Sequence, residues 1–359
     1  MCSDYLDKIN HFALYRDVPS LAIRRPLVEN PRVSVIVPTY NRAALLAETL
    51  DSILAQQGFD VFEIVVVDNN PERDDATEKL IARYEDPRIA YFKNKKNIGM
   101  FGNWNRAIEL SRGEWIAMIH DDDLLLPAYL ATVMRLVSRA PDIGLLAVDS
   151  EWRRFNPMVA TGRRFSLPTP GSLLKSVAQK LRCAFRAIRP LQKLSLKDYV
   201  LSYPHTTPGW FFRRDMALAL GGFDPKHSPC SDYYFSAKCC WHSHVYRFRR
   251  RLFVYRWGEN ESVRLETRLG FVRNDTAFRL FLVDRLGVLF KRWSIYCVCL
   301  DSAIRTRLTV PELSGEQLRT FLSGIGVGLS DVTAWDQWAY FHCWSRLFRF
   351  SLLLSECKK

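Results

Sequence analysis

Short runs of consecutive apolar residues alternate, from about residue 32 onward, with segments whose apolar residues recur at helical spacing. The predicted strands are 33–37, 63–67, 89–92 and 115–119, and the predicted helices between them are 43–57, 74–84 and 104–111. Continuous apolar strands that alternate with helices are typical of a parallel sheet covered on both faces. The pattern therefore predicts an α/β fold.

Polar residues directly follow three of these strands. Thr39–Arg42 come after the first strand, Asp68–Asn70 after the second, and Asp121–Asp123 after the fourth. Because ligands of such sheets bind outside the carboxyl ends of the strands, we expect the three segments to meet at one crevice.

Beyond Pro127 the pattern changes. We predict a helix over 128–138, a strand over 144–148 and a helical region from residue 271 onward. Residues 172–194 place apolar side chains on one stripe with basic residues around it, which predicts an amphipathic basic helix. No window reaches the roughly 18 uninterrupted apolar residues of a membrane-spanning helix, so we expect the chain not to cross a bilayer.

The net charge of +13 is unevenly distributed. Residues 1–150 carry 17 Lys and Arg against 22 Asp and Glu, a balance of −5, which leaves 34 against 16, or +18, for residues 151–359. The segment 152–197 contains eleven bases and no acid. Such a segment indicates an anionic partner, and a membrane surface or a nucleic acid would supply one.

The nine cysteines include no CxxC pair, and the N-terminus is acidic where a secretory signal would be basic and then apolar. We therefore expect free thiols and a cytoplasmic location.

The three consecutive carboxylates Asp121–Asp123 require a counter-charge, because adjacent like charges repel. A divalent cation such as Mg²⁺ or Mn²⁺ suits their oxygen ligands. The alternative is a solvated acidic turn that caps the helix after Pro127. The position of the acids at a strand end, beside two other polar segments, favours the metal.

Five motifs follow one another in the chain: PTYNR (38–42), VVVDNN (65–70), NIG (97–99), NRAIELSRGEWIAMIHDDD (105–123) and GGFD (221–224). With them the chain resembles an inverting family 2 glycosyltransferase of the GT-A fold, over about residues 32–260. The resemblance implies a Rossmann-like, mostly parallel sheet flanked by helices. It divides the chain into an N-terminal extension (1–30), a catalytic domain (31–260) with a basic insertion at about 152–197, and a C-terminal helical, basic region (261–359).

The resemblance also implies a set of site residues. Asp122 and Asp123 are expected to bind Mn²⁺ or Mg²⁺, and Asp232 is expected to be the general base that takes the proton of the acceptor hydroxyl. Asp232 could also cap the helix that follows it. The residues expected to bind the nucleotide-sugar donor are Pro38, Thr39, Tyr40, Asn41, Arg42, Asp68, Asn69, Asn97, Gly99, Asn105 and Asp121. Within this set the resemblance places Asp68 near the base and Asp121 near the ribose or phosphate.

The chain departs from the family pattern at several positions. His120 replaces the leading acid of the usual D-x-D-D run, and Ser231 replaces the glutamate that usually precedes the general base. A histidine often found in the segment 256–260 is missing, and so is the QxxRW motif of processive members. We interpret His120 as a neutral substitution, with altered metal dependence as the alternative. The missing QxxRW motif predicts an enzyme that adds one sugar and releases its product.

The reaction that the resemblance implies is transfer of a sugar from a UDP-, GDP- or dTDP-sugar to a hydroxyl of a glycan or lipid-linked glycan. We expect it to serve the synthesis of bacterial surface polysaccharide such as O-antigen, capsule or lipopolysaccharide, at the inner face of the cell membrane. A sugar-phosphate nucleotidyltransferase is an alternative, but PTYNR is not the Gly-rich basic loop that such an enzyme needs after its first strand. A nucleic-acid-binding protein would have no use for the three carboxylates, so we expect no nucleic-acid partner.

Overall fold

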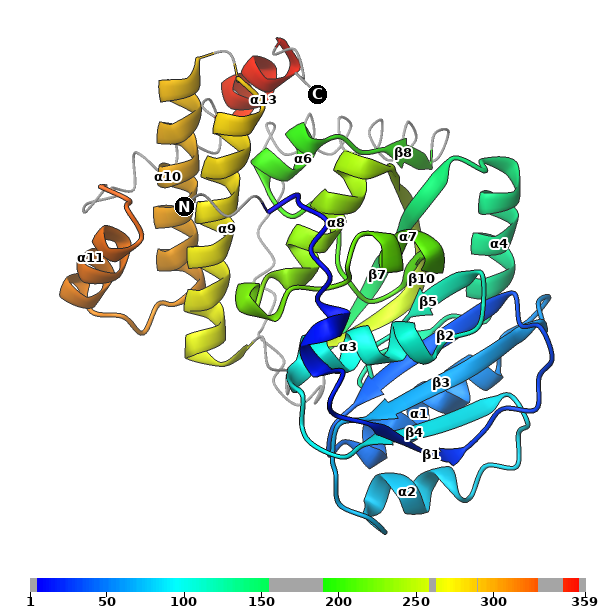
Figure 1. Ribbon diagram of the computed structural model, residues 1–359. Coiled ribbons are helices and arrows are strands. Elements are labelled where there is room, and N and C mark those ends of the chain that lie inside the picture. The colour runs from blue at the N-terminus through cyan, green and yellow to red at the C-terminus, as the bar shows by residue number, and fades with distance from the viewer. Residues whose placement is uncertain (1–4, 155–189, 258–262, 289, 329–344, 355–359) are drawn as a thin grey trace, which may run out of the picture.

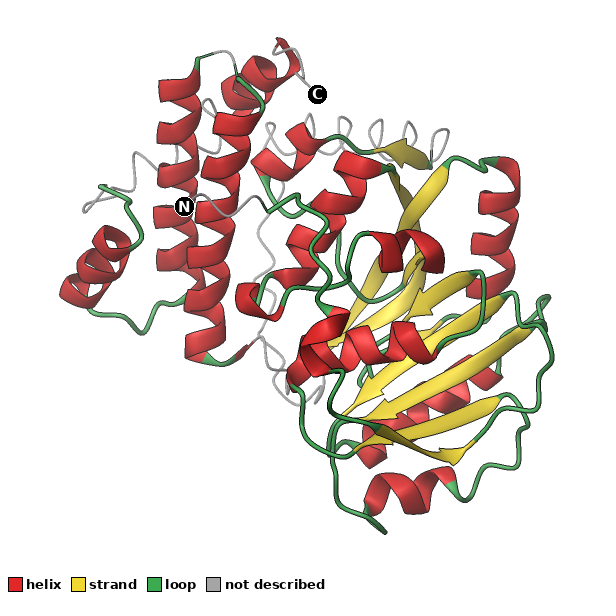
Figure 2. Cartoon of the chain, viewed as in Figure 1, coloured by secondary structure: helices red, strands yellow, loops and turns green. Residues whose placement is uncertain are grey.

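The structure is a computed structural model that describes residues 5–154, 190–257, 263–288, 290–328 and 345–354. In this part of the chain one sheet has helices against both of its faces (Figures 1 and 2). The strands are β1 (Ser20–Arg24), β2 (Val33–Thr39), β3 (Phe62–Asp68), β4 (Ile89–Asn94), β5 (Trp115–Met118), β6 (Leu124–Leu125), β7 (Ile143–Arg154), β8 (Leu191–Lys193), β9 (Trp210–Arg213) and β10 (His244–Trp257). The α-helices are α1 (Ala43–Leu54), α2 (Ala76–Ile81), α3 (Gly99–Leu110), α4 (Tyr129–Arg139), α6 (Leu196–Leu201), α7 (Arg214–Ala219), α8 (Ser231–His242), α9 (Leu265–Arg285), α10 (Lys291–Thr309), α11 (Gly315–Gly324) and α13 (Ser345–Leu354), and the 3₁₀ helices are η1 (Phe12–Tyr15) and η2 (Pro225–His227).

The strands follow the order β1-β4-β3-β2-β5-β9-β7-β10-β6 across the sheet, and β8 pairs with β10. β4, β3, β2 and β5 run parallel to one another, and so do β7 and β10. β1, β6, β8 and β9 are short and run antiparallel to their neighbours. The predicted α/β class is confirmed, with the longer pairings parallel.

Alternate residues of the parallel strands enter two apolar cores, one on each face of the sheet. On one face Ile36, Val65 and Met118 pack with residues of α3, α7, α8 and α9. On the other face Val35 and Val66 pack with residues of α1 and α4. Figure 1 shows α3 and α7 on the near side of the sheet and α1 behind it. Burial on both faces explains why these strands have continuous apolar sequences.

Several bounds differ from those predicted. α3 begins at Gly99, five residues before the helix predicted over 104–111. β7 is much longer than the strand predicted over 144–148, because it pairs with β10 along most of its length. The strands β1 and β9 were not predicted, since four or five residues carry too little periodicity to be recognised.

Most of the predicted basic helix over 172–194 lies outside the described residues. Its last part is wrong, because Leu191–Lys193 form strand β8 and pair with β10. Among the described residues, no helix is both long enough and apolar enough to span a membrane.

The predicted C-terminal helices begin earlier than residue 271, with α9 at Leu265. α9 and α10 lie side by side (Figure 1), and the fully buried guanidinium of Arg279 links them. Arg279 donates to the carbonyl of Val200 in α6 at 2.7 Å and to the carboxylates of Asp275 in α9 and Asp301 in α10. The helical pair is therefore joined to the sheet domain by a buried polar network as well as by apolar packing.

Candidate active site

The three polar segments that were expected to converge lie together at one edge of the sheet. β3, β2 and β5 are neighbours whose carboxyl ends lie side by side. The backbone N–H of Asn69 donates to the carbonyl of Thr39 at 2.9 Å, and the Thr39 hydroxyl donates to Asp121 at 2.7 Å. The fold thus brings residues from all three segments into direct contact.

Asp68, at the end of β3, is the centre of a buried network. Its carboxylate accepts hydrogen bonds from the hydroxyl of Tyr91 at 2.8 Å and the ammonium of Lys93 at 3.0 Å, and from the backbone N–H of Asn70 at 2.9 Å. Lys93 also donates to Asp75 at 2.7 Å. Burial raises the pKa of Asp68, and these hydrogen bonds oppose the shift. The charge of Asp68 is therefore compensated within the protein.

Asn69 connects this edge to the beginning of α3. Its amide nitrogen donates to the side-chain oxygen of Asn97 at 2.7 Å and to the carbonyl of Gly99 at 3.2 Å. Its oxygen accepts from the Asn94 amide at 3.1 Å and from the backbone N–H of Ile98 at 3.0 Å. All its side-chain groups are thus occupied, which fixes the loop that carries Asn97 and Gly99.

The loop after β2 exposes some of the predicted donor residues and buries others. Pro38 is buried in β2, opposite Val67. Tyr40 is 48% exposed. Asn41 has a positive φ of 55° and accepts a hydrogen bond from the Asn70 amide at 2.9 Å. Of these residues, Tyr40 offers an exposed aromatic surface to a ligand.

Asp121 and Asp122 share the guanidinium of Arg42, whose Nη1 lies 2.7 Å from Asp122 and 3.4 Å from Asp121. Both carboxylates are buried. Burial, reinforced by the charge of Asp122, raises the pKa of Asp121 to about 6 despite the opposing effect of Arg42. The geometry therefore favours the binding of additional positive charge.

Asp123 is held by the last residues of β10. Its Oδ1 accepts the backbone N–H of Arg256 at 2.8 Å, and the Arg256 side chain donates to Glu48 in α1 at 2.7 Å. Burial, with repulsion from Asp122, raises the pKa of Asp123 well above its usual range. The acids do not cap the helix after Pro127, because the N-cap of α4 is Ala128, so that alternative is wrong.

Two atoms of this cluster, Asp123 Oδ2 and His120 Nε2, are buried and have no hydrogen-bond partner among the described residues. His120, Asp122 and Asp123 each offer a ligand atom, and these atoms lie within 4.8 Å of one another. Burial lowers the pKa of His120 to about 4, so the imidazole is neutral at pH 7. Carboxylate oxygens and neutral imidazole are both ligands of divalent cations, so the residues present fit such an ion.

Asp232, the predicted general base, lies in the first turn of α8. It accepts hydrogen bonds from the hydroxyl of Thr207 and from that of Tyr203 at 3.3 Å. The N-cap of α8 is Cys230, so the alternative that Asp232 caps this helix is wrong. Burial raises the pKa of Asp232, and the two hydroxyl groups oppose this shift.

The loop that contacts Asp232 also contacts the end of β5. The backbone N–H of Gly209 donates to the carbonyl of Met118 at 2.8 Å, and β9 pairs Trp210 with Met118. Asp232 is therefore connected, through residues 207–210, to the strand that leads into the aspartate cluster. The fold brings the predicted base to the same edge of the sheet as the predicted metal ligands.

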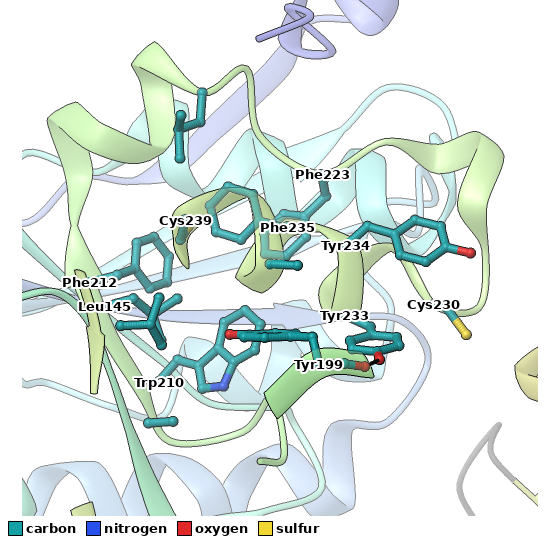
Figure 3. Packing of buried hydrophobic residues seen from close by; sticks show 14 of the residues in the cluster. Leu145, Tyr199, Trp210, Phe212, Phe223, Cys230, Tyr233, Tyr234, Phe235 and Cys239 are labelled. Carbon is teal, nitrogen blue, oxygen red and sulfur yellow. Dashed lines mark hydrogen bonds between the residues drawn. The ribbon is translucent and has the colours of Figure 1, made fainter. Parts of the chain in front are cut away.

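An aromatic core fixes the position of α8. Figure 3 shows Tyr233, Tyr234 and Phe235 of α8 packed near Trp210 and Phe223. The ring centroids of Phe223 and Phe235 are 4.4 Å apart. This dense packing holds the first turn of α8, and with it Asp232, in place.

The Asn105 side chain contacts the GGFD turn. Its amide donates to the carbonyl of Phe223, and its oxygen accepts the Phe223 N–H, both at 2.8 Å. Gly221 and Gly222 have φ values of 84° and 73°, and a Cβ on Gly222 would lie 2.4 Å from the Asn105 oxygen. The Asn105 side chain therefore positions the GGFD turn, and its contact with the donor stays a prediction.

The sequence pattern did not point to several residues that build this edge. Lys93 and Tyr91 could have been noticed, because they lie at the end of a predicted strand that follows the strand ending before Asp68. A buried lysine needs an acidic partner, and Asp68 could supply one. Tyr203 and Thr207 gave no signal, since they lie in a loop and reach Asp232 only through the tertiary fold.

The sequence model described as "Glycosyl transferase family 2" matches residues 34–215, which is more than half of the chain. The chain therefore belongs to glycosyltransferase family 2. The family and the enzyme class predicted from the motifs are confirmed.

Similarity to individual proteins covers parts of their length. An uncharacterized protein of Mycobacterium tuberculosis is 37% identical over 200 residues, which are 54% of this chain and 57% of that protein. The GalNAc(5)-diNAcBac-PP-undecaprenol beta-1,3-glucosyltransferase of Campylobacter jejuni is 39% identical over 106 residues, 29% of this chain and 34% of the relative. The chain thus spans between about a third and just over half of the length of these relatives.

Among solved structures, S. aureus TarS 1-349 in complex with UDP-GlcNAc is similar, with a TM-score of 0.53 and 16% identity, over 82% of this chain and 88% of that chain. At this identity the similarity concerns the fold alone. It supports the GT-A fold that the motifs implied.

Proposed function

We propose that the chain is an inverting, metal-dependent, non-processive glycosyltransferase. It transfers one sugar from a nucleotide-sugar to a hydroxyl of a glycan or lipid-linked glycan in the synthesis of bacterial surface polysaccharide. Membership of family 2 supports the reaction class. The name of the Campylobacter relative, which includes an undecaprenol-linked saccharide, supports the kind of acceptor.

One observation carries this proposal. The buried network around Asp68, the acidic cluster Asp121–Asp123 and the carboxylate of Asp232 lie at one edge of the sheet, although they come from distant parts of the chain. A nucleotide, a cation and a proton acceptor are the groups that sugar transfer from a nucleotide donor requires.

The residues then have distinct tasks. The end of β3 and the exposed Tyr40 bind the nucleoside of the donor. Asp122 and Asp123 hold the cation, which when bound would stabilise the departing diphosphate as a Lewis acid. Asp232 removes the proton of the acceptor hydroxyl while that hydroxyl attacks the anomeric carbon from the side opposite the leaving group, which inverts the configuration.

The environment of Asp232 suits a general base. Burial raises its pKa, and a base whose pKa lies closer to the working pH accepts a proton more readily. The hydroxyl groups of Thr207 and Tyr203 orient the carboxylate.

The test is release of nucleoside diphosphate from a panel of UDP-, GDP- and dTDP-sugars, with and without Mn²⁺, and with added bacterial lipid extract as acceptor. We expect one donor to be consumed, only with the metal and without any nucleoside triphosphate. Asp122→Ala and Asp232→Asn should each abolish this consumption, while Asp142→Asn, directly before the first residue of β7, should leave it unchanged. Consumption that needs a nucleoside triphosphate would instead show a nucleotidyltransferase.

We further propose that the enzyme works at an anionic membrane surface. The support is the basic composition of residues 152–197, with eleven bases and no acid, since each basic residue near an anionic leaflet contributes about 1 kcal/mol. Sedimentation with vesicles that contain phosphatidylglycerol at physiological salt tests this proposal. Equal sedimentation of the protein with neutral phosphatidylcholine vesicles, or no sedimentation with either kind of vesicle, would contradict it.

A further inference from the structure

The imidazole of His120 lies in the acidic cluster with no hydrogen-bond partner for one of its nitrogens. His120 Nε2 is buried and unpartnered among the described residues, and so is Asp123 Oδ2. An unsatisfied buried polar atom costs about 1–3 kcal/mol, so two such atoms in one small cluster are expensive for the fold. A cation beside Asp123 Oδ2 would satisfy that oxygen, and the imidazole faces the same oxygen with Nδ1, its other nitrogen.

The distances within the cluster suit two ligands of one cation. His120 Nδ1 lies 3.8 Å from Asp123 Oδ2, which is too long for a hydrogen bond. Two ligands about 2.1 Å from the same ion are separated by roughly 3–4 Å. Asp122 completes the set, with one ligand atom from each of the three residues inside a 4.8 Å limit.

The surroundings hold both ligands in place. The ring of Trp104 in α3 packs against the His120 ring at a tilt, with centroids 5.0 Å apart and an angle of 33° between the planes. The Oδ1 of Asp123 accepts the backbone N–H of Arg256 at 2.8 Å, which leaves Oδ2 directed toward His120. Fixed outer contacts of this kind orient metal ligands in proteins.

We infer that His120 is itself a ligand of the cation, so that this site binds the metal through one imidazole nitrogen as well as the oxygens of Asp122 and Asp123. The inference rests on the proposed function for the presence of the cation. It adds that the ion is a transition-metal ion such as Mn²⁺ in preference to Mg²⁺, because imidazole suits transition metals and Mg²⁺ prefers oxygen ligands. It also replaces the interpretation of His120 as a neutral substitution.

Electron paramagnetic resonance of bound Mn²⁺ tests this directly, without any enzymatic reaction. The full-length protein is loaded with Mn²⁺, alone and with UDP, GDP or dTDP, and the spin-echo envelope is examined for modulation by ¹⁴N. We expect imidazole ¹⁴N modulation in the wild type and its loss in His120→Gln and His120→Asp. The matched control His244→Gln, at the opposite end of β10, should keep the modulation.

Competition between the two ions supplies a second readout. The ratio of Mn²⁺ to Mg²⁺ affinity should fall at least about tenfold in His120→Asp, which restores an all-oxygen site. Bound Mn²⁺ without ¹⁴N modulation in the wild type, or an unchanged affinity ratio in His120→Asp, would overturn the inference and leave the proposed metal site standing. Failure of the wild type to bind Mn²⁺ under all four conditions would overturn both.

Discussion

Two polar regions at the same edge of the sheet differ in how completely their groups are paired. Around Asp68, the carboxylates, the lysine and the asparagines satisfy one another within the protein. In the aspartate cluster, Asp123 Oδ2 and His120 Nε2 lack partners among the described residues, and buried carboxylates face one another. The first region is complete without a ligand, whereas the second is incomplete. The pairing within the first region therefore stabilises the strand end that we propose binds the nucleoside, and the second region is adapted to bind a cation.

Lys93→Met should have the largest effect on stability. The lysine is buried and paired with Asp68 and Asp75, and removal of one partner from a buried ion pair costs about 3–5 kcal/mol. Urea unfolding should show a loss of this size. Arg73→Ala, which breaks the solvent-exposed pair with Glu78, is the control and should change the free energy of unfolding far less. Equal losses of unfolding free energy in the two variants would mean that the buried pairs of Lys93 contribute no more to stability than an exposed ion pair.

Asp123→Asn should affect activity and leave stability largely intact. Asparagine keeps the oxygen that accepts the Arg256 N–H and removes a carboxylate that its neighbours repel. Loss of a metal ligand should cost several kcal/mol of transition-state stabilisation, about a 10²–10³-fold fall in kcat/KM. The free energy of unfolding should change by less than about 1 kcal/mol. A large loss of stability would mean that the cluster is structural.

Addition of Mn²⁺ should stabilise the wild-type protein. A ligand at a hundred times its Kd contributes about 2.7 kcal/mol to the free energy of unfolding. A thermal scan should therefore show a higher Tm with Mn²⁺, and EDTA should reverse the increase. Asp123→Asn should show no such increase, whereas Arg73→Ala should show the full one. A rise of equal size in Asp123→Asn would locate the binding elsewhere.

Thr207→Val should produce the smallest change, in the pH dependence of kcat/KM. Asp232 must be ionised to accept a proton, so activity is present above its pKa and is lost as the pH falls through it. Burial raises the pKa of Asp232, and the hydrogen bond from Thr207 lowers it. Removal of a hydrogen bond worth about 1.5–3 kcal/mol should move the acidic limb upward by about one to two pH units. Thr206→Val, the control, should leave the limb in place.

The parallel half of the sheet was predictable because its strands are buried on both faces. Val35 and Val66 alternate with Ile36 and Val65 between two cores, and both sets must be apolar. β9 was not predictable, since its four residues are aromatic or basic and its position depends on pairing with β5 and β7.

The candidate site also has a part that the sequence could predict and a part that it could not. The aspartates could be predicted, because three adjacent carboxylates after an apolar strand repel one another unless a cation lies among them. The role of Asn105 could not, because its two hydrogen bonds join residues more than a hundred positions apart. The partners of Asp232 likewise come from a loop that only the pairing of β9 with β5 brings to α8.

By itself the sequence determined the α/β class and the strand ends at which polar groups gather, because these depend on local patterns of burial and charge. Its five motifs also carried the resemblance to the family. Tertiary structure alone decided which of those groups satisfy one another. Lys93 neutralises Asp68 across neighbouring strands, while His120 Nδ1 and Asp123 Oδ2 lie 3.8 Å apart, too far for a hydrogen bond. Pairing of this kind depends on distances of a few ångströms between residues far apart in the chain, and such distances are set only when the sheet has formed.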